Sequence, residues 1–206
     1  MGSARKGRFK EVDDYNKPGR DFWEVIKNYK KYSTDFEFKL FIGIPIVCSI
    51  IIFAFYWFFG NSNSELLSRI MEMNRDSLTV IAILAGFNTT SLSIIAASNN
   101  NVLKFLKRHD LPDSEDTLLK QLVSFFSFAI LLQLIVLTIG ILLSMISKSF
   151  MDISNAFPAL SGLVVKIPLT LLGALWLGAV IFVIIISIRN ATLLYRYVLF
   201  VADYDE

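Results

Sequence analysis

Four long stretches of the chain contain no charged residue, and this feature limits the possible folds more than any other. A helix needs about 20 apolar residues to cross roughly 30 Å of hydrocarbon, and each stretch is that long. Their apolar residues do not alternate with a period of two, which excludes the strands of a membrane barrel. The sequence therefore predicts an all-α polytopic membrane protein with four transmembrane helices, near residues 40–59, 77–103, 121–147 and 167–188.

Lysine and arginine are distributed unevenly around these stretches. Sixteen of the 20 lie before residue 40, within 104–120 or after 188, and the other four lie in the two remaining connections. Basic residues are retained on the cytoplasmic side of a membrane. We therefore expect a multi-pass protein of the bacterial inner (plasma) membrane with both termini in the cytoplasm. Residues 1–39 form a cytoplasmic tail, and residues 40–206 form the transmembrane domain with a short cytoplasmic C-terminal tail.

The N-terminal tail contains one segment with the periodicity of an amphipathic helix. Phe22, Val25, Ile26 and Tyr29 recur at helical spacing, with basic residues between them and after them. A helix of this kind binds the surface of an anionic membrane or docks a cytosolic protein, and both interpretations remain open. The residues expected to make this contact are Trp23, Lys27, Lys30 and Lys31.

Residues 64–76 also have helical periodicity, and no helix-breaking residue separates them from the second stretch. One helix over residues 64–103 would be roughly 60 Å long and would project beyond the outer face of the membrane. The connection that follows contains His109, Asp113, Glu115 and Asp116. These residues lack the spacing of a metal-binding loop, and we expect a solvated loop in which Asp113 or Ser114 caps the next helix.

Two amides interrupt the apolar stretches. Asn88 is expected near the middle of the hydrocarbon, where an unsatisfied amide costs several kcal/mol. Counted from the cytoplasmic connection, Asn88 and Gln133 differ in depth by only about 4–5 Å, so the two side chains can pair within one helical hairpin. Two alternatives remain: each amide meets its copy in another subunit, or both line a water-filled pore.

Small residues follow one face of the second stretch. Ala82, Gly86, Thr90, Ser93 and Ala97 recur at intervals of 4, 4, 3 and 4. Small faces let helix backbones approach closely in lipid, where apolar side chains gain little from association. The fourth stretch adds Gly178, four residues after Ala174. Several such faces indicate a homo-oligomer, with the intramembrane contacts made by Asn88, Thr90, Ser93, Gly86, Gln133 and Gly178.

The composition argues against a catalytic or metal-binding function. One cysteine and one histidine make thiolate or imidazole metal sites improbable, and the four stretches contain no ionisable side chain for a proton relay or for catalysis. We therefore expect no catalytic residue, no metal, no cofactor and no enzymatic activity. A formal net charge of +2 gives no reason to expect direct nucleic-acid binding. Two functions remain: an oligomeric membrane sensor or scaffold that controls a cytosolic protein, and a pore-forming effector that depolarises the membrane.

The basic tail, the four spans, the short loops and the run ILAGFNTTSLSII together resemble small four-span proteins of bacterial anti-phage operons. The membrane subunit of the Kiwa system is the nearest such family. The resemblance implies an inner-membrane oligomer that reports infection to a cytosolic, DNA-associated partner. It supplies no catalytic residue.

Overall fold

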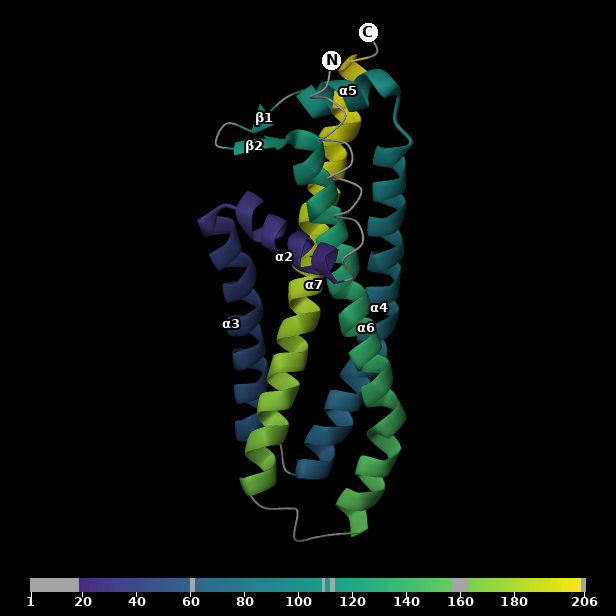
Figure 1. Ribbon diagram of the computed structural model, residues 1–206. Helices are drawn as coiled ribbons and strands as arrows, with labels where there is room; N and C mark the ends of the chain where they lie inside the picture. Colours follow the sequence, from purple (N-terminus) through teal and green to yellow (C-terminus); the bar gives the residue numbers. More distant parts are fainter. Residues whose placement is uncertain (1–18, 60–61, 109, 112–113, 157–162, 205–206) are drawn as a thin grey trace.

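The computed structural model describes residues 19–59, 62–108, 110–111, 114–156 and 163–204. Four of its helices are long and apolar enough to cross a membrane, which confirms the helical class and the number of candidate spans predicted from the sequence. They lie side by side along the length of the molecule (Figure 1). The four helices are α3 (Asp35–Phe59), α4 (Asn63–Ala96), α6 (Leu118–Ala156) and α7 (Leu163–Tyr204).

Helices α4, α6 and α7 pack together, and α3 packs mainly on α7. The central core contains Ile81 of α4, Val136 of α6 and Trp176 of α7, each buried. The outer surface of α3 is apolar, with Ile51 and Phe55 each more than 60% exposed. Exposed aliphatic and aromatic side chains along a whole helix are typical of a surface in contact with lipid.

The second span ends earlier than the sequence predicted. Helix α4 stops at Ala96, and a separate helix α5 (Asn100–Arg108) follows, so a single helix continuing to Leu103 is wrong. The break falls in a run of serine and asparagine, residues that hydrogen-bond the local backbone in competition with a helix. Here the Asn99 side chain accepts a bond from the Asn101 backbone N–H at 3.2 Å. The break lets α5 bury Val102 and Leu106 against α6 and α7.

The first half of α4 also differs from the expectation. Residues 64–76 were expected to project beyond the outer face, but they run beside α3, where Leu66 and Ile70 pack on Phe53. The physical reason is that the apolar side chains of this segment cover apolar side chains of α3 and α7 that would otherwise be exposed. Ser62 begins the helix, because its side-chain oxygen accepts a bond from the Glu65 backbone N–H at 3.2 Å.

A short helix, α2 (Arg20–Tyr32), lies across α6 before α3 begins (Figure 1). Its buried residues Tyr29 and Tyr32 pack on Phe125 of α6, and the Tyr29 ring also stacks on Phe128 at 3.9 Å between ring centres. The connection before α6, expected as a loop, contains β1 (Asp110–Leu111) paired antiparallel with β2 (Ser114–Thr117). His109 and Asp113 lie outside the described residues.

Candidate functional site

A cluster of polar side chains lies inside the bundle, where α4, α6 and α7 meet. The Asn88 amide nitrogen donates to Gln133 Oε1 at 3.2 Å and to Ser187 Oγ at 3.3 Å. Gln133 Nε2 donates to the same Ser187 oxygen at 2.7 Å, and Asn190 Nδ2 donates to Asn88 Oδ1 at 2.8 Å. All four side chains are at most 2% exposed. The cluster therefore joins three helices through one shared set of hydrogen bonds.

This arrangement decides between the interpretations of Asn88 and Gln133. The two amides pair within the helical hairpin, as their predicted depths allowed, and both are fully covered by the chain itself. Their partners Ser187 and Asn190 lie at the end of the charge-free part of α7, next to Arg189. Asn88 therefore lies opposite the last turn of that stretch. Its expected depth in the bilayer stays a prediction.

The sequence reasoning missed Ser187 and Asn190. The signal was available, because residues three apart share one face of a helix, and this pair adjoins a charge-free stretch. It missed Asn74 of α4 as well, which donates to the Gly140 carbonyl at 3.0 Å and to Ser144 Oγ at 2.8 Å on α6. At Gly140 an added Cβ would lie 2.6 Å from Leu78 Cδ2 and 2.9 Å from Asn74 Oδ1, so a larger residue would require these side chains to move.

The small residues of the second stretch do not face the bundle. Gly86, Thr90 and Ser93 are all exposed, and a Cβ added at Gly86 would meet no atom within 4 Å. They belong to a longer exposed face whose members recur at alternating intervals of four and three residues. This face, called here the α4 polar face, consists of Glu65, Arg69, Glu72, Asp76, Thr79, Ile83, Gly86, Thr90, Ser93 and Ala97.

Gly178 of α7 lies where α7 packs on α3 of the same chain. A Cβ at this position would lie 3.5 Å from Ser49 Oγ and 3.9 Å from the Pro45 carbonyl oxygen, both on α3 of the same chain. The small residue lets α3 and α7 approach each other closely. The structure thus uses Gly178 for packing within the chain, whereas Gly86 is left uncovered.

The four residues of α2 that were expected to contact lipid headgroups or a partner divide into two groups. Trp23, Lys27 and Lys30 are exposed on the side of α2 away from α6, and the Trp23 side chain is 69% exposed. Lys31 instead pairs with Asp116 of β2 at 2.5 Å, and Asp116 also pairs with Lys120 at 2.8 Å. These ammonium groups, Lys120 first, hold the pKa of the Asp116 carboxyl well below its usual range.

The ion pairs of Asp116 with Lys31 and Lys120 predict that the stability of the folded protein depends on pH. A carboxylate with a lowered pKa contributes fully above its unfolded pKa of about 4, and the contribution is lost as pH falls through the folded value. Asp116→Asn should therefore lower the unfolding temperature at pH 7 and reduce the further loss that the wild type shows at pH 3. Asp21→Asn, at an exposed carboxylate of α2, serves as the control. An unchanged pH dependence in Asp116→Asn would contradict the assignment.

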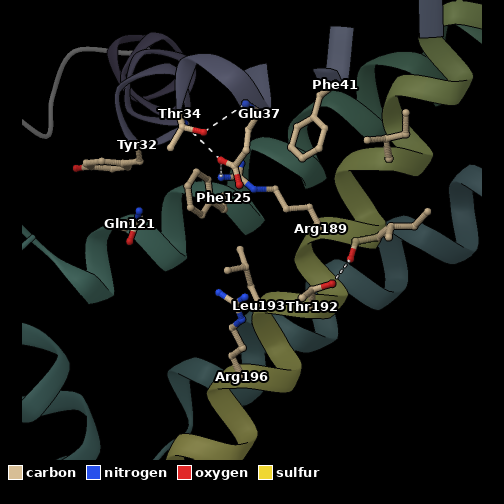
Figure 2. Close-up of a pocket in the computed structure, with 12 residues that line it drawn as sticks. Tyr32, Thr34, Glu37, Phe41, Gln121, Phe125, Arg189, Thr192, Leu193 and Arg196 are labelled. Carbon is tan, nitrogen blue, oxygen red and sulfur yellow. Dashed lines mark hydrogen bonds and ion pairs between the residues drawn. The ribbon is translucent and has the colours of Figure 1, made fainter. Parts of the chain in front are cut away.

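Arg189 of α7 was treated from the sequence only as one of the basic residues after the fourth span, yet it holds three elements together. Its guanidinium donates to Glu37 Oε2 of α3 at 3.1 Å and to Ser33 Oγ, after α2, at 3.2 Å. It also lies over the Phe125 ring of α6, 3.9 Å from the ring centre. Figure 2 shows Arg189, Glu37 and Phe125 lining a cavity that extends along α7 to Arg196.

Among the residues that the structure describes, no three His, Cys, Asp or Glu side chains gather as metal ligands would. Comparison of the chain with protein-family models, with curated proteins and with solved structures gives no match. Three features of the fold described above define the candidate site. They are the buried cluster around Asn88, the α4 polar face, and the Arg189 cavity.

Proposed function

We propose that the protein is a non-enzymatic subunit of a homo-oligomer in a bacterial inner membrane, where it acts as a sensor or scaffold that holds a cytosolic protein. The observation that carries the proposal is the α4 polar face. It is exposed over the whole length of α4, although α4 is one of the four candidate spans.

The depth of this face is fixed by the chain. Only residues 60–62 separate α3 from α4, so α4 begins at the level where α3 ends. Asp76 is 13 residues beyond the start of α4, which is about 20 Å along the helix. With α3 crossing about 30 Å of hydrocarbon, Arg75 and Asp76 lie well inside it. Their side chains are 76% and 75% exposed.

Lipid cannot cover such a surface, because a charged side chain within the hydrocarbon costs several kcal/mol. Charged residues at this depth face a neighbouring protein surface or water. The signs along α4 alternate, with Glu65, Arg69, Glu72, Arg75 and Asp76 in order. Within one chain Arg69 pairs with Glu72 and Arg75 with Asp76, each at 3.5 Å. A second copy of the same face can add further pairs between these arginines and its own carboxylates, and the small residues from Gly86 onward let the backbones approach.

The cytosolic partner is proposed from α2. Its contacts with α6 orient Trp23, Lys27 and Lys30 outward, toward the cytoplasm in the orientation that the basic residues favour. An exposed tryptophan with basic neighbours fits an acidic protein surface or the lipid headgroups beside the helix. The resemblance to the membrane subunits of anti-phage systems makes defence the context in which we place this partner.

A pore is the second candidate, and the same face favours it. Oligomers in which Thr79, Thr90 and Ser93 surround a central axis would enclose a path with hydroxyl and charged groups along its wall. The pore version no longer involves Asn88 and Gln133, which are buried within one chain.

Ion flux and partner capture separate the two functions. Purified protein in phospholipid vesicles with a K⁺ gradient should give no flux above empty vesicles if it is a scaffold. Cytosolic protein captured by the full chain in its own cells should be lost with Trp23→Ala plus Lys30→Gln and kept with Lys107→Gln, a control on α5. Flux in the wild type whose ion preference reverses in Asp76→Arg would replace the scaffold by the pore.

A further inference from the structure

A cavity of about 630 Å³ opens beside α7 at the level of Arg189. Its walls come from the start of α3, from α6 and from α7, and Figure 2 shows Arg189, Thr192 and Arg196 in sequence along the α7 side. These three residues are three and four positions apart, so they share one face of the helix. The other polar side chains that line the cavity are Tyr32, Thr34, Glu37 and Gln121.

The charge of this cavity suits an anion. Two arginines and one glutamate line it, which leaves one positive charge in excess. Arg189 is already held by Glu37 and Ser33. Arg196 is exposed and has no ion pair or side-chain hydrogen bond to any residue that the structure describes. A guanidinium with its donors available binds phosphate oxygens well.

An apolar groove of about 480 Å³ lies between α3 and α7. Its lining residues Ile42 and Phe182 are one and three positions from Phe41 and Ile185, which line the cavity. On α3 it is lined by residues such as Ile46 and Ile50. On α7 its lining residues continue the face of Arg189, at alternating intervals of four and three. That face runs through Leu171, Leu175, Gly178, Phe182, Ile185, Arg189, Thr192 and Arg196. A polar cavity and an apolar groove along the same face of α7 fit an amphipathic ligand.

The position of the cavity along α7 identifies the ligand class. Lys166 and Arg189 bound a charge-free stretch of 22 residues, about 33 Å of helix, which matches the thickness of the hydrocarbon. At the far end Lys166 donates to the Trp57 carbonyl at 3.2 Å and lies over its ring, an arrangement typical of a membrane interface. Arg189 therefore lies at the level of the lipid phosphates on the opposite side.

We propose that the cavity binds the phosphodiester headgroup of one anionic glycerophospholipid, with an acyl chain in the groove between α3 and α7. Arg196 supplies the main contact to the phosphate, and Arg189 adds its charge while keeping its bond to Glu37. The inference rests on the four helices crossing a bilayer and not on the oligomer or the cytosolic partner proposed above.

Lipid binding to the purified full chain tests the site, by native mass spectrometry with added dioleoyl phosphatidylglycerol or dioleoyl phosphatidylcholine. Arg196→Gln should weaken phosphatidylglycerol binding about fivefold, and Ile46→Trp, which fills the groove without changing charge, should weaken it at least as much. The matched controls are Lys107→Gln, an exposed lysine of α5, and Ile51→Trp, on the outer surface of α3. Neither control should change binding.

The same titration with sodium phosphate separates a lipid from a free anion. The proposal requires that phosphatidylglycerol binds more tightly than phosphatidylcholine and that both site variants lose this preference. If Arg196→Gln abolishes binding of inorganic phosphate while Ile46→Trp leaves phosphatidylglycerol binding unchanged, the site is one for a soluble anion and the lipid assignment is overturned. Equal binding of the two lipids by the wild type overturns it as well. Neither result bears on whether copies of the chain associate.

Discussion

Asn88→Leu is expected to lower the free energy of unfolding by about 2–4 kcal/mol, because it removes an amide that bonds to the three other side chains of the buried cluster, on both of the other helices. Gln133, Ser187 and Asn190 would each lose a partner while remaining buried. A single hydrogen bond between membrane helices contributes only about 0.6 kcal/mol on average. The larger expected loss comes from the buried groups left without partners.

Unfolding of the purified protein by titration with a denaturing detergent measures this loss. The control is Asn101→Leu, which makes the same substitution at an exposed asparagine of α5 and should change stability by less than about 0.5 kcal/mol. The Asn88→Leu/Gln133→Leu double variant should be less destabilised than the sum of the single variants, since it removes both partners of one bond. Equal stability of Asn88→Leu and the control would mean that the cluster does not hold the helices together.

The sequence predicted the parts of the fold that depend on the exclusion of charge. The four apolar helices follow from this one property, because no soluble helix of this length lacks charge on every side. The Asn88–Gln133 pair followed from counting residues inward from a shared connection. The count took the second span as one helix to Leu103, whereas α4 ends at Ala96. The pair still forms because α4 and α6 are neighbouring helices of the hairpin.

The features that the sequence missed depend on how the helices are placed against one another. Arg189 follows the last apolar residue of the fourth stretch, so its position alone marked it as a tail residue, although it contacts α2, α3 and α6. Residues 64–76 contain charges, so they were placed outside the bilayer. Only the packing of Ile70 on Phe53 brings that segment back beside α3. Charge content alone therefore did not predict that the apolar side of this amphipathic segment packs on α3.

Gly86→Trp is expected to separate the copies of the chain while leaving each copy folded. Gly86 lies on the α4 polar face with open space beyond it, so the indole does not disturb the monomer but prevents close approach of a second backbone. Gly43→Trp on α3 is the matched control, because a Cβ there also meets no atom within 4 Å. Light scattering of the purified proteins should give an oligomer for the wild type and for Gly43→Trp, and a monomer for Gly86→Trp.

This comparison distinguishes the α4 polar face from the exposed surface of α3 around Gly43. An oligomer that survives Gly86→Trp but dissociates with Gly43→Trp would move the contact to α3. In that case the charges at Arg75 and Asp76 would need water to cover them, as in the pore. The folded state of both variants is checked by their unfolding in detergent, which should match that of the wild type within about 0.5 kcal/mol.

The mass of the wild-type assembly released directly from a lipid bilayer tests the central claim most directly, since the claim is that a second copy covers a charged face inside the membrane. Mass spectrometry from lipid nanodiscs should record a multiple of 23.3 kDa for the wild type and 23.3 kDa alone for Gly86→Trp. A wild-type protein that leaves the bilayer only as a single chain of 23.3 kDa would contradict the account.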